Sequence, residues 1–91
     1  MTLSKNDFGS LCIYALRYCN GRQTYAPGAV ISIVTSNLKE ITDRDLGVMI
    51  SDCEYQRYMD RYGDSKIDKP MWVAFESRLK KEREDRKQCQ S

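Results

Sequence analysis

The apolar residues of this chain recur mainly at intervals of three and four, which is the spacing of an amphipathic helix. Over residues 7–20 such a face is formed by Phe8, Leu11, Cys12, Ala15 and Cys19. Ser4 and Asp7 have the spacing of a helix N-cap, and Gly21 stands where a glycine often ends a helix. Residues 11–16 are apolar almost all round the helix. We therefore expect this first helix to be the central one, surrounded by the others.

A second helix is predicted over residues 27–38. Pro27 suits a first helical turn, where its missing N–H is not needed. The apolar stripe consists of Val30, Ile31, Val34 and Leu38. The same segment is also rich in β-branched residues, which is typical of a strand. We favour a helix because the spacing is helical and no partner strand is visible elsewhere.

A third helix is predicted over residues 43–62, with Thr42 and Asp45 forming its N-cap and Gly63 ending it. One face carries Leu46, Met49, Ile50, Cys53 and Arg57. A second, more aromatic face carries Tyr55, Tyr58, Met59 and Tyr62. Two such faces indicate contacts on two sides of the helix, one of which is open to a partner chain.

A fourth helix is predicted to begin near Asp68, with Pro70 in its first turn. Its apolar anchors are Met71 or Trp72, Phe75 and Leu79. Beyond Leu79 the only apolar residue is Cys89. Pairs of opposite charge four residues apart, such as Glu82 with Arg86, support a helix there. We expect residues 80–91 to form a solvated, fraying helix end.

These elements predict an all-α fold, a small bundle of about four helices forming one domain over residues 1–91. A chain of 91 residues is long enough for one domain and short for two. The sequence has no signal-peptide pattern and no apolar run of about 18 residues. We expect a cytosolic protein with reduced thiols that does not enter a membrane.

The composition of the chain argues against several classes of function. The net charge of +2 argues against an acidic DNA mimic and against a general nucleic-acid binder, which usually carries a clear basic excess. The chain has no histidine, and its cysteines form no CxxC pair, so common catalytic and zinc-binding arrangements are missing. Asp43, Asp45 and Asp52 are a possible Mg²⁺ site, but acids near a helix start are more often caps. We expect a binding protein that is not an enzyme and uses no cofactor or metal.

The first candidate site is the junction between the first two helices. Its ligand-binding candidates are Arg17, Tyr18, Arg22, Thr24 and Tyr25. Guanidinium groups can grip a phosphate through paired hydrogen bonds, a helix N-terminus attracts anions, and tyrosine rings can stack on a base. The alternative is structural: Arg17 pairs with an acid of the third helix, for example Asp52, and Tyr25 packs at the junction.

The second candidate site is the aromatic face of the third helix. Its interface candidates are Tyr55, Tyr58, Arg61 and Tyr62, with Arg57 beside them. Tyrosine and arginine are enriched at the energetic centres of protein interfaces, and they also stack well on bases. The alternative is that the tyrosine rings cover the core and hold only their hydroxyls in water.

Several short motifs resemble a family of small uncharacterised proteins from phages and prophages of Gram-positive bacteria. The similarity covers about residues 8–80. It rests on the run from Leu11 to Cys19, on Gly21-Arg22, Thr24-Tyr25 and Pro27, and on Val48-Met49-Ile50, Tyr62-Gly63-Asp64 and Trp72. The resemblance implies inhibition of bacterial immunity in the host cytosol. Such inhibitors act as anti-CRISPR proteins on a Cas nuclease, or as sponges that capture nucleotide signals.

Three functional hypotheses follow. The first is a homo-oligomeric sponge that sequesters a cyclic or other signalling nucleotide. Its phosphate and base would be held by Arg17, Arg22, Thr24 and Tyr25, with Tyr55, Tyr58 and Arg61 supplied by a neighbouring subunit. The alternative is an anti-CRISPR-type protein that binds a Cas effector or another host defence protein directly. The third is a small DNA-associated regulatory phage protein with a helix-turn-helix. The acids that begin the third helix would repel DNA phosphates, so nucleic acid ranks last.

Overall fold

The fold is all-α. The computed structural model describes residues 4–19, 27–58 and 68–89. Within these ranges the chain forms α1 (Lys5–Cys19), α2 (Pro27–Ser36), the short 3₁₀ helix η1 (Leu38–Glu40), α3 (Asp43–Tyr58) and α4 (Asp68–Cys89). The prediction of a small bundle of about four helices is confirmed. The β-branched residues of α2 are helical, as their spacing indicated.

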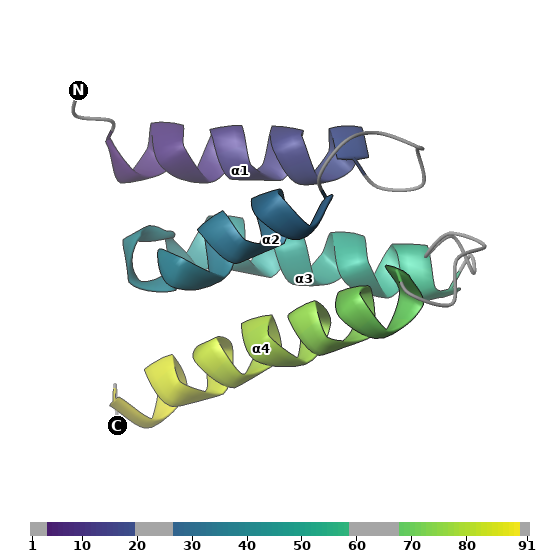
Figure 1. Ribbon diagram of the computed structural model, residues 1–91. Coiled ribbons are helices and arrows are strands. Elements are labelled where there is room, and N and C mark those ends of the chain that lie inside the picture. Colours follow the sequence, from purple (N-terminus) through teal and green to yellow (C-terminus); the bar gives the residue numbers. More distant parts are fainter. Residues whose placement is uncertain (1–3, 20–26, 59–67, 90–91) are drawn as a thin grey trace.

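The helices are arranged with α1 and α4 at opposite edges and with α2 and α3 between them (Figure 1). The third helix packs against both α1 and α4. Helices α1 and α3 run in the same direction, because Gly9 lies against Asp45 near their starts and Arg17 meets Asp52 near their ends. The C-terminal ends of α1 and α3 therefore lie at the same end of the bundle (Figure 1).

A single core joins α1, α2, η1, α3 and α4. Val34 and Leu79 are fully enclosed, and the Trp72 and Phe75 rings meet edge to face with centroids 6.0 Å apart. The buried apolar residues are Cys12, Leu16, Val34, Leu38, Ile41, Leu46, Met49, Ile50, Cys53, Trp72, Phe75 and Leu79. They include most of the positions that the helical spacing predicted. At the surface of α1, the structure differs from the prediction.

The prediction that the first helix is central is wrong. Leu11 and Tyr14, in the middle of α1, are 57% and 72% exposed. The described neighbours of α1 are α2, η1 and α3, and these leave its outer side uncovered. Helices α2 and α3 have the central position instead, because each of them packs against both α1 and α4. Among the described helices, α1 is therefore apolar nearly all round but buried on one side only.

Local capping sets where the helices begin and end. The hydroxyl of Ser4 accepts a hydrogen bond from the Asp7 backbone N–H at 3.1 Å, so α1 begins directly after Ser4. The Thr42 hydroxyl caps α3 in the same way, with the Asp45 N–H at 3.2 Å. Helix α2 ends at Ser36, two residues earlier than predicted. The Asn37 side-chain amide donates to the Ile33 carbonyl at 2.8 Å, which replaces the next backbone hydrogen bond.

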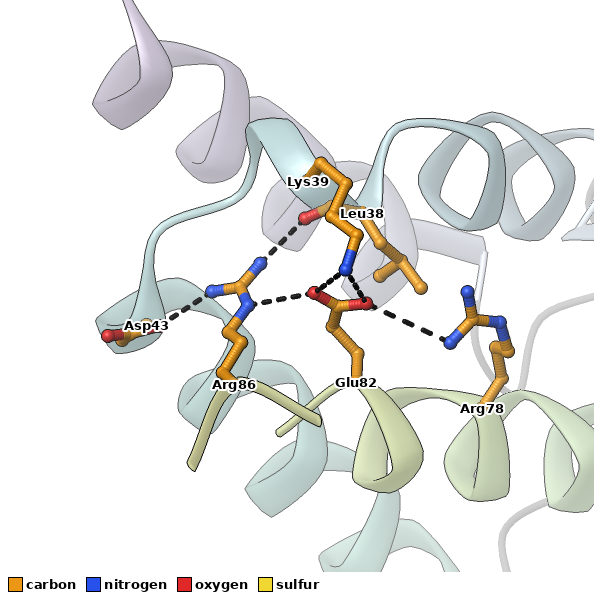
Figure 2. Close-up of polar contacts among 6 residues, drawn as sticks. All are labelled: Leu38, Lys39, Asp43, Arg78, Glu82 and Arg86. Carbon is orange, nitrogen blue, oxygen red and sulfur yellow. Dashed lines mark hydrogen bonds and ion pairs between the residues drawn. The ribbon is translucent and has the colours of Figure 1, made fainter. Parts of the chain in front are cut away.

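The second half of α4 is anchored, and the prediction of a solvated helix end is wrong at Glu82. This side chain is 1% exposed, and its carboxylate accepts hydrogen bonds from Lys39 Nζ at 3.1 Å and Arg86 Nε at 2.9 Å. Arg86 also donates to the Leu38 carbonyl and to Asp43, both at 2.7 Å (Figure 2). The expected pairing of Glu82 with Arg86 is confirmed, but it belongs to a network that fastens α4 to residues 38–43.

Candidate functional site

The two sites predicted from the sequence lie at one end of the bundle. Arg17 and Tyr18 occupy the last turn of α1, and Tyr55 and Tyr58 lie in the last turns of α3, which runs parallel to it. We call the surface formed by Arg17, Tyr18, Asp52, Tyr55 and Tyr58 the aromatic end. The remaining predicted residues, Arg22, Thr24, Tyr25, Arg61 and Tyr62, lie outside the described residues.

An ion pair between α1 and α3 joins the two halves of the aromatic end. Arg17 donates from Nε to Asp52 Oδ2 at 2.7 Å and from Nη2 to Asp52 Oδ1 at 3.2 Å. The hydrogen bond and the charge of Asp52 together raise the pKa of Arg17 above its ordinary value. The pairing that the structural alternative named is confirmed. An anion approaching Arg17 would therefore meet a carboxylate that already uses two of its donors.

The tyrosines of the aromatic end are open to solvent. Tyr58 is 86% exposed, and Tyr18 and Tyr55 are each about half exposed. Tyr55 and Tyr58 do not belong to the buried core or to the partly buried residues packed against it. The ring of Tyr58 therefore contributes little cover to the core, whereas the half-exposed Tyr55 is compatible with that alternative and Tyr62 lies outside the described residues. This end presents aromatic rings that a partner could bury.

The end of α3 that carries these tyrosines is fastened to α4. Glu76, a buried residue of α4, forms ion pairs with Arg57 at 3.1 Å and with Lys80 at 2.9 Å. Arg57 stands between Tyr55 and Tyr58 in the sequence, so the ion pair holds the backbone that presents both rings. A rigid helix end lowers the entropy lost when a partner binds there.

One small pocket opens beside the Arg17–Asp52 pair, between α1, α3 and α4. It has a volume of about 20 Å³, close to the space of one water molecule. Its lining residues are Leu16, Arg17, Met49, Asp52, Cys53, Gln56, Trp72 and Phe75. The pocket is too small for a nucleotide. The described part of the aromatic end is thus suited to contact by a surface rather than to enclosure of a small molecule.

Two cysteines near this site are poor nucleophiles. Burial, together with the negative charges of Glu76 and Asp52, raises the pKa of the Cys53 thiol to about 12. Burial also raises the pKa of Cys12, with Asp45 contributing. Both thiols stay protonated near neutral pH, and only the thiolate attacks or binds metal well. Over the three described ranges, no group of three or more histidine, cysteine or acidic side chains is placed to hold a metal ion.

Comparison with known proteins gives no relative from which a function could be transferred. No family model, no curated protein sequence and no solved structure matches this chain. The described helices also include none with the length and apolar character required to span a bilayer. The function must therefore be argued from the side chains themselves.

Two features escaped the sequence reasoning. The first is the uncovered side of α1. The sequence shows that α1 is apolar nearly all round. It does not show that the side with Leu11 and Tyr14 is the one exposed to solvent. The second is the buried Glu82, whose partner Lys39 is 43 residues away in the sequence. A local pattern gives no indication of contacts at that separation.

Proposed function

We propose that this protein acts without catalysis, by binding a protein partner at the aromatic end. The observation that carries the proposal is the Arg17–Asp52 ion pair beside the exposed rings of Tyr18, Tyr55 and Tyr58. Tyrosine and arginine are the residue types enriched at interface hot spots, where a few large side chains supply most of the binding energy. A paired arginine contributes flat, weakly hydrated surface rather than free charge.

Charge favours a protein over a nucleotide as the partner. A phosphate needs cationic groups that are not already neutralised, whereas Arg17 is bound through two nitrogens to Asp52. A protein surface can bind tyrosine rings and a neutral ion pair, and it does not require cationic groups that are still unpaired. DNA is less favoured still, since α3, the recognition helix of a helix-turn-helix reading, packs between α1 and α4.

The resemblance to phage and prophage proteins makes a bacterial defence protein, such as a Cas effector, the partner class to test first. An inhibitor of this kind would work by occupying the surface that the defence protein needs for its own activity. Such a protein requires affinity and a rigid binding surface, and it requires no catalytic residues. This is consistent with the missing histidine and the inert buried thiols.

The test is affinity capture with purified defence proteins, comparing the wild type with Tyr55→Ala/Tyr58→Ala. Truncating two hot-spot tyrosines should weaken binding by roughly a hundredfold or more, since each costs about 2 kcal/mol or more. Val73→Ala removes an exposed apolar side chain elsewhere, on α4, and should bind as the wild type does. Equal capture by all three proteins would show that the aromatic end is not the binding surface.

Sequestration of a signalling nucleotide is the second candidate. It is supported by the 61% exposure of the Arg17 side chain, which leaves guanidinium donors facing solvent beside Tyr18. Arg22, Thr24 and Tyr25 follow α1 directly in the sequence. Calorimetry with a panel of linear and cyclic nucleotides tests it. Binding that is lost in Arg22→Ala with unchanged helicity would favour the sponge, and no heat with any nucleotide would count against it.

A further inference from the structure

The outer side of α1 carries an apolar stripe that no other described helix covers. Leu11 and Tyr14 form its centre and are both more than half exposed. Asp7 lies one turn before Leu11 on the same side, and Tyr18 lies one turn after Tyr14. In Figure 1, α1 forms an outer edge of the bundle, and α2, α3 and α4 all lie on one side of it. We call Asp7, Leu11, Tyr14 and Tyr18 the outer stripe.

We propose that the outer stripe joins two copies of this chain, whose α1 helices pack antiparallel about a two-fold axis. The proposal goes beyond binding at the aromatic end, because its centre, Leu11 and Tyr14, lies outside that surface. It assigns to a second copy the side of α1 that the described helices leave uncovered.

The stripe is complementary to itself in the antiparallel direction. With the two-fold axis between residues 12 and 13, Leu11 of one copy faces Tyr14 of the other, and each of these contacts occurs twice. Asp7 comes level with Arg17 and Tyr18 of the second copy, so a carboxylate meets a guanidinium and a hydroxyl at both ends. Antiparallel helix dipoles also attract.

The parallel arrangement lacks these advantages. It would set Asp7 against Asp7, so that like charges face each other at one end of the contact. Arg17 can serve a second carboxylate in the antiparallel pair because a guanidinium has five N–H donors, and Asp52 accepts from its Nε and Nη2 atoms. The charges therefore favour antiparallel packing of the two α1 helices. Leu11 and Tyr14 supply the apolar surface that is buried between the two copies.

The sequence of α1 fits this arrangement. A helix that is apolar nearly all round is usually buried on all sides, yet the described chain buries only one side of α1. A second copy would cover the rest without any other protein. The stripe is small compared with a standard interface, so we expect a reversible dimer with a dissociation constant in the micromolar range.

Sedimentation velocity of the full chain, run across a wide range of protein concentrations, tests the dimer. The wild type should pass from monomer to dimer, and Tyr14→Glu should raise the dissociation constant about tenfold or more. Ile33→Glu is the matched control, since Ile33 is similarly exposed but lies on α2. It should dimerise as the wild type does. A wild type that stays monomeric, or a dimer that Tyr14→Glu leaves intact, overturns the proposal.

A charge-pair rescue tests the direction of packing. Leu11→Lys and Tyr14→Glu should each be monomeric alone, because each buries an unpaired charge against an uncharged side chain at the centre of the contact. Mixed in equal amounts, they should form a heterodimer in which Lys at 11 faces Glu at 14, while the native Tyr14–Leu11 contact is kept. A parallel pair brings no such charges together, so a mixture that stays monomeric rules out the antiparallel register.

The dimer and the proposed function can be tested independently, because different variants should abolish each of them. Tyr55→Ala/Tyr58→Ala should lose partner capture and keep the wild-type dimer. Tyr14→Glu should lose the dimer and keep one-to-one capture of the partner, although avidity for an immobilised partner would fall. If Tyr55→Ala/Tyr58→Ala lost the dimer instead, self-association would belong to the aromatic end and the outer stripe would be excluded as its site.

Discussion

Arg17 of α1 and Asp52 of α3 are 35 positions apart in the sequence, and their side chains meet at 2.7 Å. This pair marks the end of the bundle at which the parallel helices α1 and α3 carry their tyrosines. It also offsets the charge of the arginine that the sequence offered as a phosphate ligand. The structural interpretation of Arg17 is thus confirmed, and its role in ligand binding stays a prediction.

The energetic contribution of this pair should be small. Both side chains are partly in water, which screens their attraction, so a double-mutant cycle with Arg17→Met and Asp52→Asn should give a coupling of ~1 kcal/mol or less. Urea denaturation of the four proteins measures it, and added salt should reduce it further. A coupling of several kcal/mol would mean that the pair is held far from solvent.

The network around Glu82 should matter more. Glu82→Gln keeps the size of the side chain but removes the charge that Lys39 and Arg86 neutralise (Figure 2). We expect the free energy of unfolding to fall by about 1–3 kcal/mol, because buried hydrogen bonds to a charged group are lost. Glu84→Gln, which removes an exposed acid from the same helix, is the control and should change stability little. Equal effects of both substitutions would contradict the importance of the network.

The same carboxylate should give the stability a dependence on acid pH. Burial alone would raise the pKa of Glu82, but hydrogen bonds from Arg86 and Lys39 and their charges outweigh it and lower the pKa. A lowered folded-state pKa stabilises the protein above the unfolded pKa of about 4.3, and this stabilisation is lost as the pH falls through the folded value. Thermal melts between neutral pH and about pH 3 should therefore fall more steeply for the wild type than for Glu82→Gln.

Gly9 should be intolerant of any side chain. A Cβ atom at this position would overlap the carboxylate of Asp45, a buried residue at the start of α3. Gly9→Ala should destabilise the protein by ~1–3 kcal/mol because α1 and α3 must separate to admit the methyl group. Gly47→Ala is the matched control. No atom lies within 4 Å of a Cβ there, so the gain in helix propensity should stabilise the protein by up to about 1 kcal/mol.

Cys12 and Cys53 should resist alkylation while the protein is folded. Their pKa values are raised by burial, that of Cys53 to about 12, so the reactive thiolate is scarce. After brief treatment with iodoacetamide at pH 8, peptide mapping should find these two cysteines unlabelled, and both should react once the protein is unfolded in urea. Rapid labelling of either thiol in the folded state would contradict the packing of the core.

The sequence predicted what short-range physics controls. Helix starts at Ser4 and Thr42 follow from side-chain caps, and the buried stripe of α3 follows from spacing alone. The prediction from sequence failed where a contact joins charged residues that are far apart in the sequence, as for Glu82. For α1 it recognised a helix with apolar residues on all sides, but not that the described helices cover only some of those sides. The sequence could offer the pairing of Arg17 with Asp52 only as one option, because the fold decides which acid lies near Arg17.

Native mass spectrometry of the tagged protein, purified from a Gram-positive host that carries defence systems, tests the central claim most directly. The account predicts a complex with a second, different protein at fixed stoichiometry, absent from the Tyr55→Ala/Tyr58→Ala variant and present in Val73→Ala. A spectrum holding only this chain, or this chain with a small anionic adduct that releases a nucleotide on denaturation, would contradict it.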